Sequence, residues 1–192
     1  MITLPKDKMP EAEVSLRLAF FLIAKGLVSS AVRVSIDGAQ VQTNDTVHFP
    51  IIEFLLSYGW SAPYSQTSFQ GRYRHSQFAL QIELNAKPGK GDVVASLVTG
   101  QRLWVECKKG PLIQIKSSQE YSLLREAVGQ LLTIEEVGES DVLAVAVPSS
   151  PKFEELAERW RAAPLVKRLH LSILTVNRNN EVNGLFDVPA IG

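Results

Sequence analysis

The sequence has a single cysteine and no long apolar run, and each shortage excludes a class of protein. One cysteine, Cys107, excludes an internal disulfide and a cysteine-rich zinc site. The longest apolar run, residues 18–24, is far shorter than the roughly 20 apolar residues that a membrane-spanning helix needs. The first residues carry several acids and no signal-peptide pattern. We therefore expect a soluble, cytoplasmic protein with no membrane partner.

Nucleotide-binding fingerprints and repeats are also missing. The glycines at residues 89 and 91 precede a predicted strand rather than a helix, so they form neither a Walker loop nor a dinucleotide fingerprint. The histidines, His48, His75 and His170, are too scattered to bind a metal through local spacing. A length of 192 residues suits one domain, and 45% hydrophobic residues suffice for a real core.

The net charge is zero, but the charges are unevenly distributed. Residues 72–125 hold nine basic and four acidic residues, whereas residues 126–192 hold six basic and ten acidic residues. A basic segment favours binding of phosphate backbones, although runs of charge also occur on ordinary solvated surfaces. The candidate nucleic-acid contacts in this segment are Arg72, Arg74, Lys87, Lys90, Lys109 and Lys116.

The N-terminal quarter of the sequence is expected to form a separate extension. Apolar residues at helical spacing predict a helix over residues 11–25. Two β-like runs around Asp37-Gly38 predict a hairpin over residues 31–42. Residues 1–47 are then an N-terminal helix and hairpin, and residues 48–192 form the core.

The core pattern predicts an α/β fold. An antiparallel meander followed by parallel crossover units implies a mixed central sheet with helices on both faces. Ser150-Pro151 is typical of a helix start, and Pro164 is expected to interrupt that helix. The predicted elements are a helix over 48–58, strands over 76–85, 92–98 and 102–108, a helix over 117–136, a strand over 142–147, a helix over 150–169 and a strand over 171–176.

Three charged residues on two neighbouring strands form a candidate site. Because side chains alternate along a strand, Glu106 and Lys108 share one face and Cys107 points the other way. Asp92 opens the preceding strand, and a tight hairpin would place its carboxylate beside Glu106. The two carboxylates could bind a divalent cation, with the ammonium as a charged helper beside it, or the three groups could be surface ion pairs that contribute about 0–1 kcal/mol each.

The order of elements and the Asp92, Glu106 and Lys108 pattern resemble the PD-(D/E)XK nucleases, which have the restriction-endonuclease-like fold. The resemblance covers roughly residues 48–147. In that family an acid starts the second core strand, the (D/E)xK triplet lies on the third, and a helix crosses to a fourth. Gly91 stands where the family has proline before the first acid.

The resemblance implies a role for each site residue. Asp92 and Glu106 would bind Mg²⁺, for which Mn²⁺ can substitute, and the carbonyl of Cys107 would add a ligand. Lys108 would orient or deprotonate the attacking water, or stabilise the phosphorus centre.

Two helix residues extend the predicted site. Many family members carry a glutamate on the helix before the meander, and Glu53 is the candidate here, because it lies on the apolar stripe of its helix. The alternative is a carboxylate at the edge of that stripe that reaches water. Gln130, in the helix after the triplet, would approach the site or the nucleic-acid backbone, or be an ordinary solvated residue.

The sequence therefore predicts a Mg²⁺-dependent nuclease that acts on DNA in preference to RNA. A homodimer would suit cleavage of both strands of a duplex. The main alternative is a non-catalytic module of the same fold that binds nucleic acid or protein. A second alternative is a structural protein in which Asp92, Glu106 and Lys108 are only surface pairs.

Overall fold

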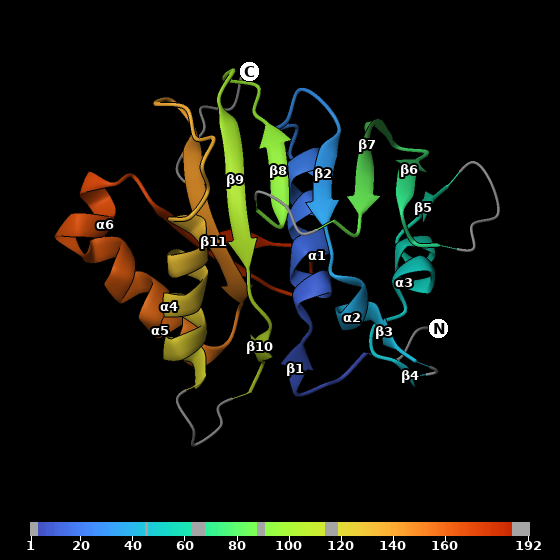
Figure 1. Ribbon diagram of the computed structural model, residues 1–192, viewed down its shortest axis with the longest axis horizontal. Helices are drawn as coiled ribbons and strands as arrows, with labels where there is room; N and C mark the ends of the chain where they lie inside the picture. Colours follow the sequence, from blue (N-terminus) through green and yellow to red (C-terminus); the bar gives the residue numbers. More distant parts are fainter. Residues whose placement is uncertain (1–3, 45, 63–67, 88–90, 114–118, 186–192) are drawn as a thin grey trace.

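A nine-stranded sheet dominates the computed structural model, which describes residues 4–44, 46–62, 68–87, 91–113 and 119–185 (Figure 1). Its strands are β2 (Val32–Ser35), β5 (Trp60–Ser61), β6 (Gly71–His75), β7 (Phe78–Asn85), β8 (Val93–Ser96), β9 (Arg102–Cys107), β11 (Val142–Pro148), β12 (Ser172–Val176) and β13 (Val182–Asn183). The helices are α1 (Glu11–Ala24), α2 (Gly38–Val41), α3 (Ile51–Ser57), α4 (Gln119–Leu131), α5 (Pro151–Ala162) and α6 (Pro164–Arg168). Two small ribbons pair β1 (Lys8–Met9) with β10 (Gly110–Pro111) and β3 (Gln42–Thr43) with β4 (Thr46–Val47).

The large sheet combines antiparallel and parallel neighbours in the order β13-β12-β11-β9-β8-β2-β7-β6-β5. β8 runs antiparallel to both β9 and β2. β9, β11 and β12 run parallel to one another, and the helices α4, α5 and α6 lie in the connections between them. Parallel neighbours need such long connections, which are usually helical. The predicted α/β class, a mixed sheet flanked by helices, is confirmed.

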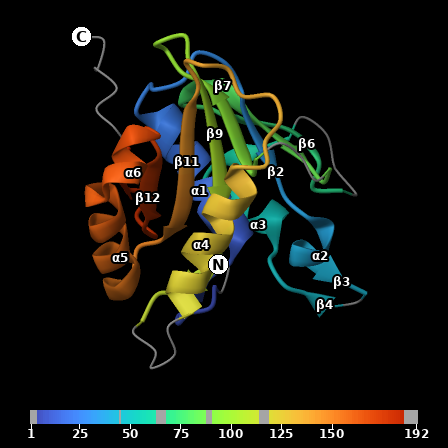
Figure 2. The same cartoon turned by 60° about the vertical axis from the view of Figure 1, so that its left-hand side comes forward.

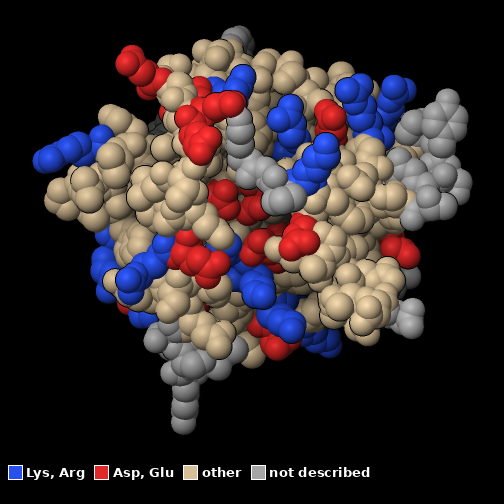
Figure 3. Space-filling model, in the orientation of Figure 1, with Lys and Arg blue, Asp and Glu red and all other residues tan. Residues whose placement is uncertain are grey.

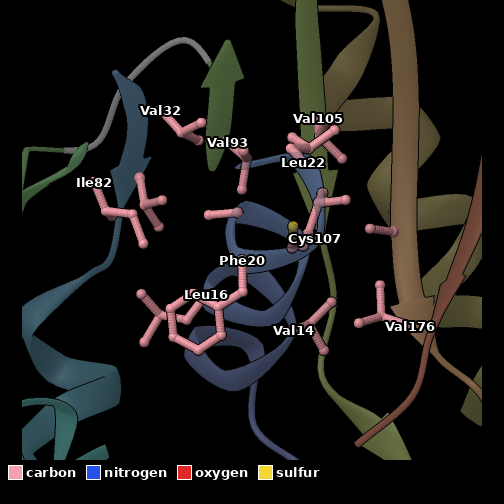
Figure 4. Close-up of a cluster of buried hydrophobic side chains, with 14 of the residues drawn as sticks. Val14, Leu16, Phe20, Leu22, Val32, Ile82, Val93, Val105, Cys107 and Val176 are labelled. Atoms are coloured by element: carbon pink, nitrogen blue, oxygen red, sulfur yellow. The ribbon is translucent and has the colours of Figure 1, made fainter. Parts of the chain in front are cut away.

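α1 is the centre of the larger apolar core. Every residue from Ala12 to Phe20 is buried. Val32, Val93 and Val105, from three neighbouring strands, lie around this helix in the same cluster (Figure 4). Full burial of one such side chain contributes about 1.5–3 kcal/mol, so the packing of α1 is a large part of the stability of the fold.

α4 and α5 cover the opposite face of the sheet, over β9, β11 and β12 (Figure 2). A second apolar cluster lies there, with Leu124 and Phe153 from the helices and Trp104, Val145 and Ile173 from the strands. β11 contributes side chains to both clusters. This double burial explains why the sequence is continuously apolar over residues 142–147.

The predicted division at residue 47 is wrong, because the first 47 residues are part of the sheet and its core. β2 lies between β8 and β7, so the sheet continues on both sides of it. α1 packs against the same sheet over β2, β7, β8 and β9. The pairing of β2 joins residues about 50 to 60 positions apart, and local patterns cannot reveal such a pairing.

The predicted hairpin over residues 31–42 is also wrong. Its first half is β2, but the residues after Asp37 form the short helix α2. The side chain of Asp37 accepts a hydrogen bond from the backbone N–H of Ala39 at 3.0 Å. Asp37 is therefore the N-cap of a helix rather than a turn residue, and aspartate is favoured in both positions.

The start of α5 and its break at Pro164 match the local signals, whereas the end of α4 does not. Ser150 caps α5 by accepting a hydrogen bond from the N–H of Phe153, and Pro164 separates α5 from α6 as predicted. α4 ends at Leu131, five residues before the predicted end, and the predicted start at residue 117 lies outside the described residues. Among the helices in the described part of the chain, none has the length and apolar character required to cross a membrane.

Leu16→Ala is expected to lower the free energy of unfolding by about 3 kcal/mol, because it leaves a cavity under a fully buried helix. Leu165→Ala, at a side chain 61% exposed, should change it by less than about 0.5 kcal/mol. Urea unfolding monitored by tryptophan fluorescence measures both. If the Leu16→Ala protein unfolds at the same urea concentration as the wild type, residues 1–47 would be a separable extension instead.

Candidate active site

Asp92 and Glu106 face each other across two antiparallel strands. Val93 of β8 pairs with Val105 of β9, so the same register places Asp92 opposite Glu106. The backbone N–H of Cys107 donates a hydrogen bond to Oδ2 of Asp92 at 2.7 Å, and the N–H of Asp92 donates to the Val105 carbonyl at 2.9 Å. These two bonds fix the carboxylate of Asp92 at the end of the β8–β9 pair.

The residue before Asp92 must be able to take a left-handed conformation. Gly91 has φ of +88°, and a Cβ atom at this position would lie 3.3 Å from the carbonyl oxygen of Val105. Proline is restricted to φ near −65°, so it could not occupy this position with the same backbone. The glycine that replaces the expected proline is therefore required by the local chain path.

The two facing carboxylates retain protons at higher pH than isolated ones do. Burial, together with the nearby negative charge of Asp92, raises the pKa of Glu106 to about 8. Burial also raises the pKa of Asp92 to about 6, against the lowering effect of the hydrogen bond from Cys107. The pair is half-buried, so a bound cation would favour the ionised form of both carboxylates.

The ammonium group of Lys108 lies between carboxylates on two different helices. Its Nζ atom is 3.2 Å from Oε1 of Glu126 in α4 and 4.0 Å from Oε2 of Glu11 in α1. Burial alone would lower the pKa of Lys108, but Glu11 and Glu126 outweigh burial and raise it. The surroundings of Lys108 therefore favour its charged form.

Glu11 is a residue of this site that sequence reasoning missed. It lies in the first turn of α1, its side chain is 13% exposed, and its Oε1 accepts a hydrogen bond from Gln40 at 2.8 Å. Glutamate is common in a first helical turn, where it interacts favourably with the helix dipole, so the local sequence carried no special signal. Only the packing of α1 against β9 places Glu11 beside Lys108.

The prediction for Glu53 is wrong, because its side chain is exposed and does not belong to an inward apolar stripe. Glu53 lies in α3, which packs against β5 at the edge of the sheet. β5 is five strand spacings, roughly 24 Å, from β9. The inward face of α3 is formed by Ile51, Phe54 and Leu55. Glu53 reaches water, and Glu11 is the helix glutamate near the candidate site.

A pocket of about 370 Å³ opens over the two carboxylates. Gln130 of α4 lines it together with Asp92 and Glu106, so the structure brings this predicted residue to the site. Lys87, an exposed candidate contact, lines the same pocket. Acidic side chains gather near the middle of this face of the molecule, and basic side chains surround them (Figure 3). The pocket could admit a phosphate-sized group next to the carboxylates.

The other predicted basic contacts are distributed around the site. Arg72 and Arg74 are exposed on β6, and Arg72 lies 3.9 Å from Glu83. Lys109 is exposed just beyond the end of β9. Lys90 and Lys116 lie outside the described residues. The side chain of Cys107 is fully buried on the α1 face, where burial raises the pKa of its thiol well above the usual range, so it is unsuited to be a nucleophile.

The donor set fits a divalent cation that keeps most of its water. Magnesium is usually bound by one or two carboxylates with several retained waters, and Asp92 and Glu106 supply two carboxylates on one face. The residues that the structure describes contain no group of three or more His, Cys, Asp or Glu side chains arranged to hold a metal. A cation at this pair would therefore depend on water, backbone or substrate oxygens for its other ligands.

Comparison with protein-family models, curated proteins and solved structures finds no match. Similarity therefore assigns no family, and the resemblance carried by Asp92, Glu106 and Lys108 stays a prediction. The structure contributes geometry instead. It places two carboxylates face to face, a charged lysine beside two further acids, and a pocket over the pair.

Without added metal, the free energy of unfolding should fall as the pH rises between about 4 and 9. An unfolded glutamate releases its proton near pH 4.3, whereas folded Glu106 retains it up to its pKa of about 8. The folded state therefore binds the extra proton in this window, and that stabilisation is lost as the pH rises through the folded pKa. Glu106→Gln removes the titrating group and should flatten the profile in urea unfolding curves.

The exposed Glu53→Gln is the matched control for this pH series. It removes one carboxylate of the same type, so its stability profile should have the wild-type slope. If Glu106→Gln also keeps the wild-type slope of unfolding free energy against pH, then no buried carboxylate titrates at the β8–β9 pair.

Proposed function

We propose that this protein is a metal-dependent nuclease that hydrolyses phosphodiester bonds in DNA and has the restriction-endonuclease-like fold. One observation carries the proposal: Asp92 and Glu106 face each other under a pocket, with the buried ammonium group of Lys108 nearby. The raised pKa values of the two carboxylates are typical of functional sites, and a bound cation would take the place of the retained protons. A fixed positive charge can bind a phosphate.

The arrangement of elements supports the fold assignment. Asp92 immediately precedes β8, and Glu106 and Cys107 end β9, the neighbouring antiparallel strand. α4 then crosses to β11, which runs parallel to β9. From the second core strand onward this is the order that the resemblance implies. The resemblance put the preceding helix at residues 48–58, and in this proposal α1 and its Glu11 take the place of that helix and of Glu53.

In this proposal Asp92 and Glu106 hold Mg²⁺ or Mn²⁺, and the carbonyl of Cys107 is a candidate third ligand. The cation, when bound, makes a water more nucleophilic and stabilises the leaving oxygen. The hydrogen bond from Cys107 keeps the Asp92 carboxylate oriented toward the pocket. Gln130 presents an amide at the pocket wall, where it can donate a hydrogen bond to a phosphate oxygen or accept one from water.

Lys108 contributes charge, and Glu126 and Glu11 hold that charge in place. A phosphodiester undergoing attack gains negative charge on its oxygens, and a nearby ammonium stabilises this charge more than it stabilises the starting ester. Because both carboxylates keep the ammonium protonated, Lys108 is assigned to orientation and charge stabilisation. Glu126 is largely exposed, so this partner can release Lys108 toward a substrate.

A non-catalytic nucleic-acid-binding module is the second candidate function. The exposed arginines on β6 favour it, because they can bind phosphates without any cleavage. This candidate predicts salt-sensitive binding of nucleic acid with no turnover in Mg²⁺ or Mn²⁺.

Purified protein should cut DNA in the presence of Mg²⁺ or Mn²⁺ and lose this activity in EDTA. Glu106→Ala and Lys108→Ala should each lower the rate by about 100-fold or more while the protein stays folded, because the first removes a proposed metal ligand and the second removes a positive charge that stabilises the reacting phosphate. Gel assays of a labelled duplex, with circular dichroism to confirm folding, measure this. Glu158→Ala, an exposed acid of α5, should retain wild-type activity. Cleavage that persists in EDTA, or in Glu106→Ala, would contradict the mechanism.

Glu11 and Glu53 can be compared directly, since both are helix glutamates and only one lies at the site. Glu11→Gln should slow cleavage by about tenfold, because it removes a negative charge 4.0 Å from the ammonium of Lys108. Glu53→Gln should leave the rate unchanged. Single-turnover assays of the two variants give the comparison, and the reverse ranking would restore Glu53 as the site residue.

A further inference from the structure

Half of one face of the sheet has no helix packed on it. α4 and α5 cover this face over β9, β11 and β12, whereas α1 packs on the other face. On the face of the sheet where α4 lies, no helix in the described part of the chain covers β8, β2, β7 or β6 (Figures 1 and 2). The side chains on this open part alternate with the buried ones and are mainly polar: Arg33, Ser35, Arg72, Arg74, Gln81, Glu83, Asn85 and Ser96.

The open face leads directly to the two carboxylates. The N–H of Ser35 donates a hydrogen bond to the carbonyl oxygen of Asp92 at 2.8 Å, and Ser35 pairs with Asn85 on the next strand. Ser35 also lines the pocket over Asp92 and Glu106. The open face and the candidate active site therefore form one continuous surface, which extends three strand spacings, about 14 Å, from β8 to β6.

Arginines dominate the charge of this face. In the strand register, Arg33 of β2 lies opposite Glu83 of β7, and Glu83 lies opposite Arg72 of β6. Two arginines therefore flank one acid in a row across three strands. Arg74 is two residues along β6 on the same face, and Arg33, Arg72 and Arg74 are all exposed. Basic side chains are visible over β2, β7 and β6, with little acid among them (Figure 3). Guanidinium groups match phosphate geometry better than other cations do.

The open face offers no aromatic side chain among its described residues. Tyr73 of β6 and Phe78 of β7 belong to the apolar core on the α1 side of the sheet. Sheets that bind single strands usually present aromatic rings on which the bases stack. Without such rings, contacts to phosphates remain, and these suit a duplex whose bases are already stacked.

We propose that Arg33, Arg72 and Arg74, together named the arginine face, bind the phosphate backbone of the nucleic-acid duplex beside the bond that is cut. The substrate class rests on the proposed nuclease function, but the binding surface rests on its own geometry. At 3.4 Å per base pair, the 14 Å of open sheet corresponds to about four base pairs flanking the cut. Lys87, which follows β7 and lines the pocket, would guide the strand toward Asp92 and Glu106.

Fluorescence anisotropy tests the arginine face apart from catalysis. A labelled mixed-sequence duplex is titrated in EDTA with Glu106→Gln, and with the same protein carrying Arg33→Gln, Arg72→Gln and Arg74→Gln. The triple change should weaken binding about tenfold or more and reduce the slope of log K against log salt by about three, one for each lost phosphate contact. The Glu106→Gln protein that keeps all three arginines should also bind the duplex more tightly than the corresponding single strand.

A matched control removes three charges elsewhere. Arg159→Gln, Lys167→Gln and Arg168→Gln alter exposed residues of α5 and α6, beyond α4, and should leave the affinity and the salt slope unchanged. Equal effects of the two triple changes would overturn the proposal, since only net charge would then matter. Tighter binding of the single strand would overturn the assignment to a duplex.

The outcomes also separate this inference from the nuclease proposal. Duplex binding that depends on the arginine face, in a wild-type protein that does not cut with Mg²⁺ or Mn²⁺, would support the surface and refute catalysis. Metal-dependent cutting with binding that is indifferent to the three arginines would support catalysis and refute the surface.

Discussion

The pairing of β8 with β9 is the constraint on which the rest of the site depends. It places two acids opposite each other in half-buried positions, where like charges repel and hydration is incomplete. A hydrogen bond from Cys107 to Asp92 holds this unfavourable arrangement in place. Strain of this kind is commonly retained at functional sites, where it is relieved when a cation or substrate binds.

The same elements that build the core also build the site. α1 fills the larger apolar core, and its first turn carries Glu11 to within 4.0 Å of Lys108. α4 covers the other face of β9 and supplies Glu126 and Gln130. Because both helices are fixed by burial, the backbone that carries these side chains is held in place. On the face where α4 lies, no described helix covers β2, β7 and β6, and the proposed substrate path follows from that gap.

Local signals predicted the parts of the fold that local chemistry determines. Side-chain alternation and a short turn were enough to place Asp92 beside Glu106, and the Ser150 cap and Pro164 break follow from backbone chemistry. The central position of β2 could not be predicted, because it depends on pairing with strands about 50 to 60 residues away. Glu11 was missed for the same reason, and Glu53 was chosen in its place from a local pattern that the packing of α3 does not support.

Anomalous X-ray scattering from a crystal of the protein grown or soaked with Mn²⁺ tests most directly whether Asp92 and Glu106 together hold a divalent cation. We expect a peak between the two carboxylates, with oxygen ligands at about 2.1 Å, and loss of the peak in Asp92→Asn. A wild-type crystal with Mn²⁺ bound elsewhere, and with no peak at this pair, would show that the pair is not a cation site.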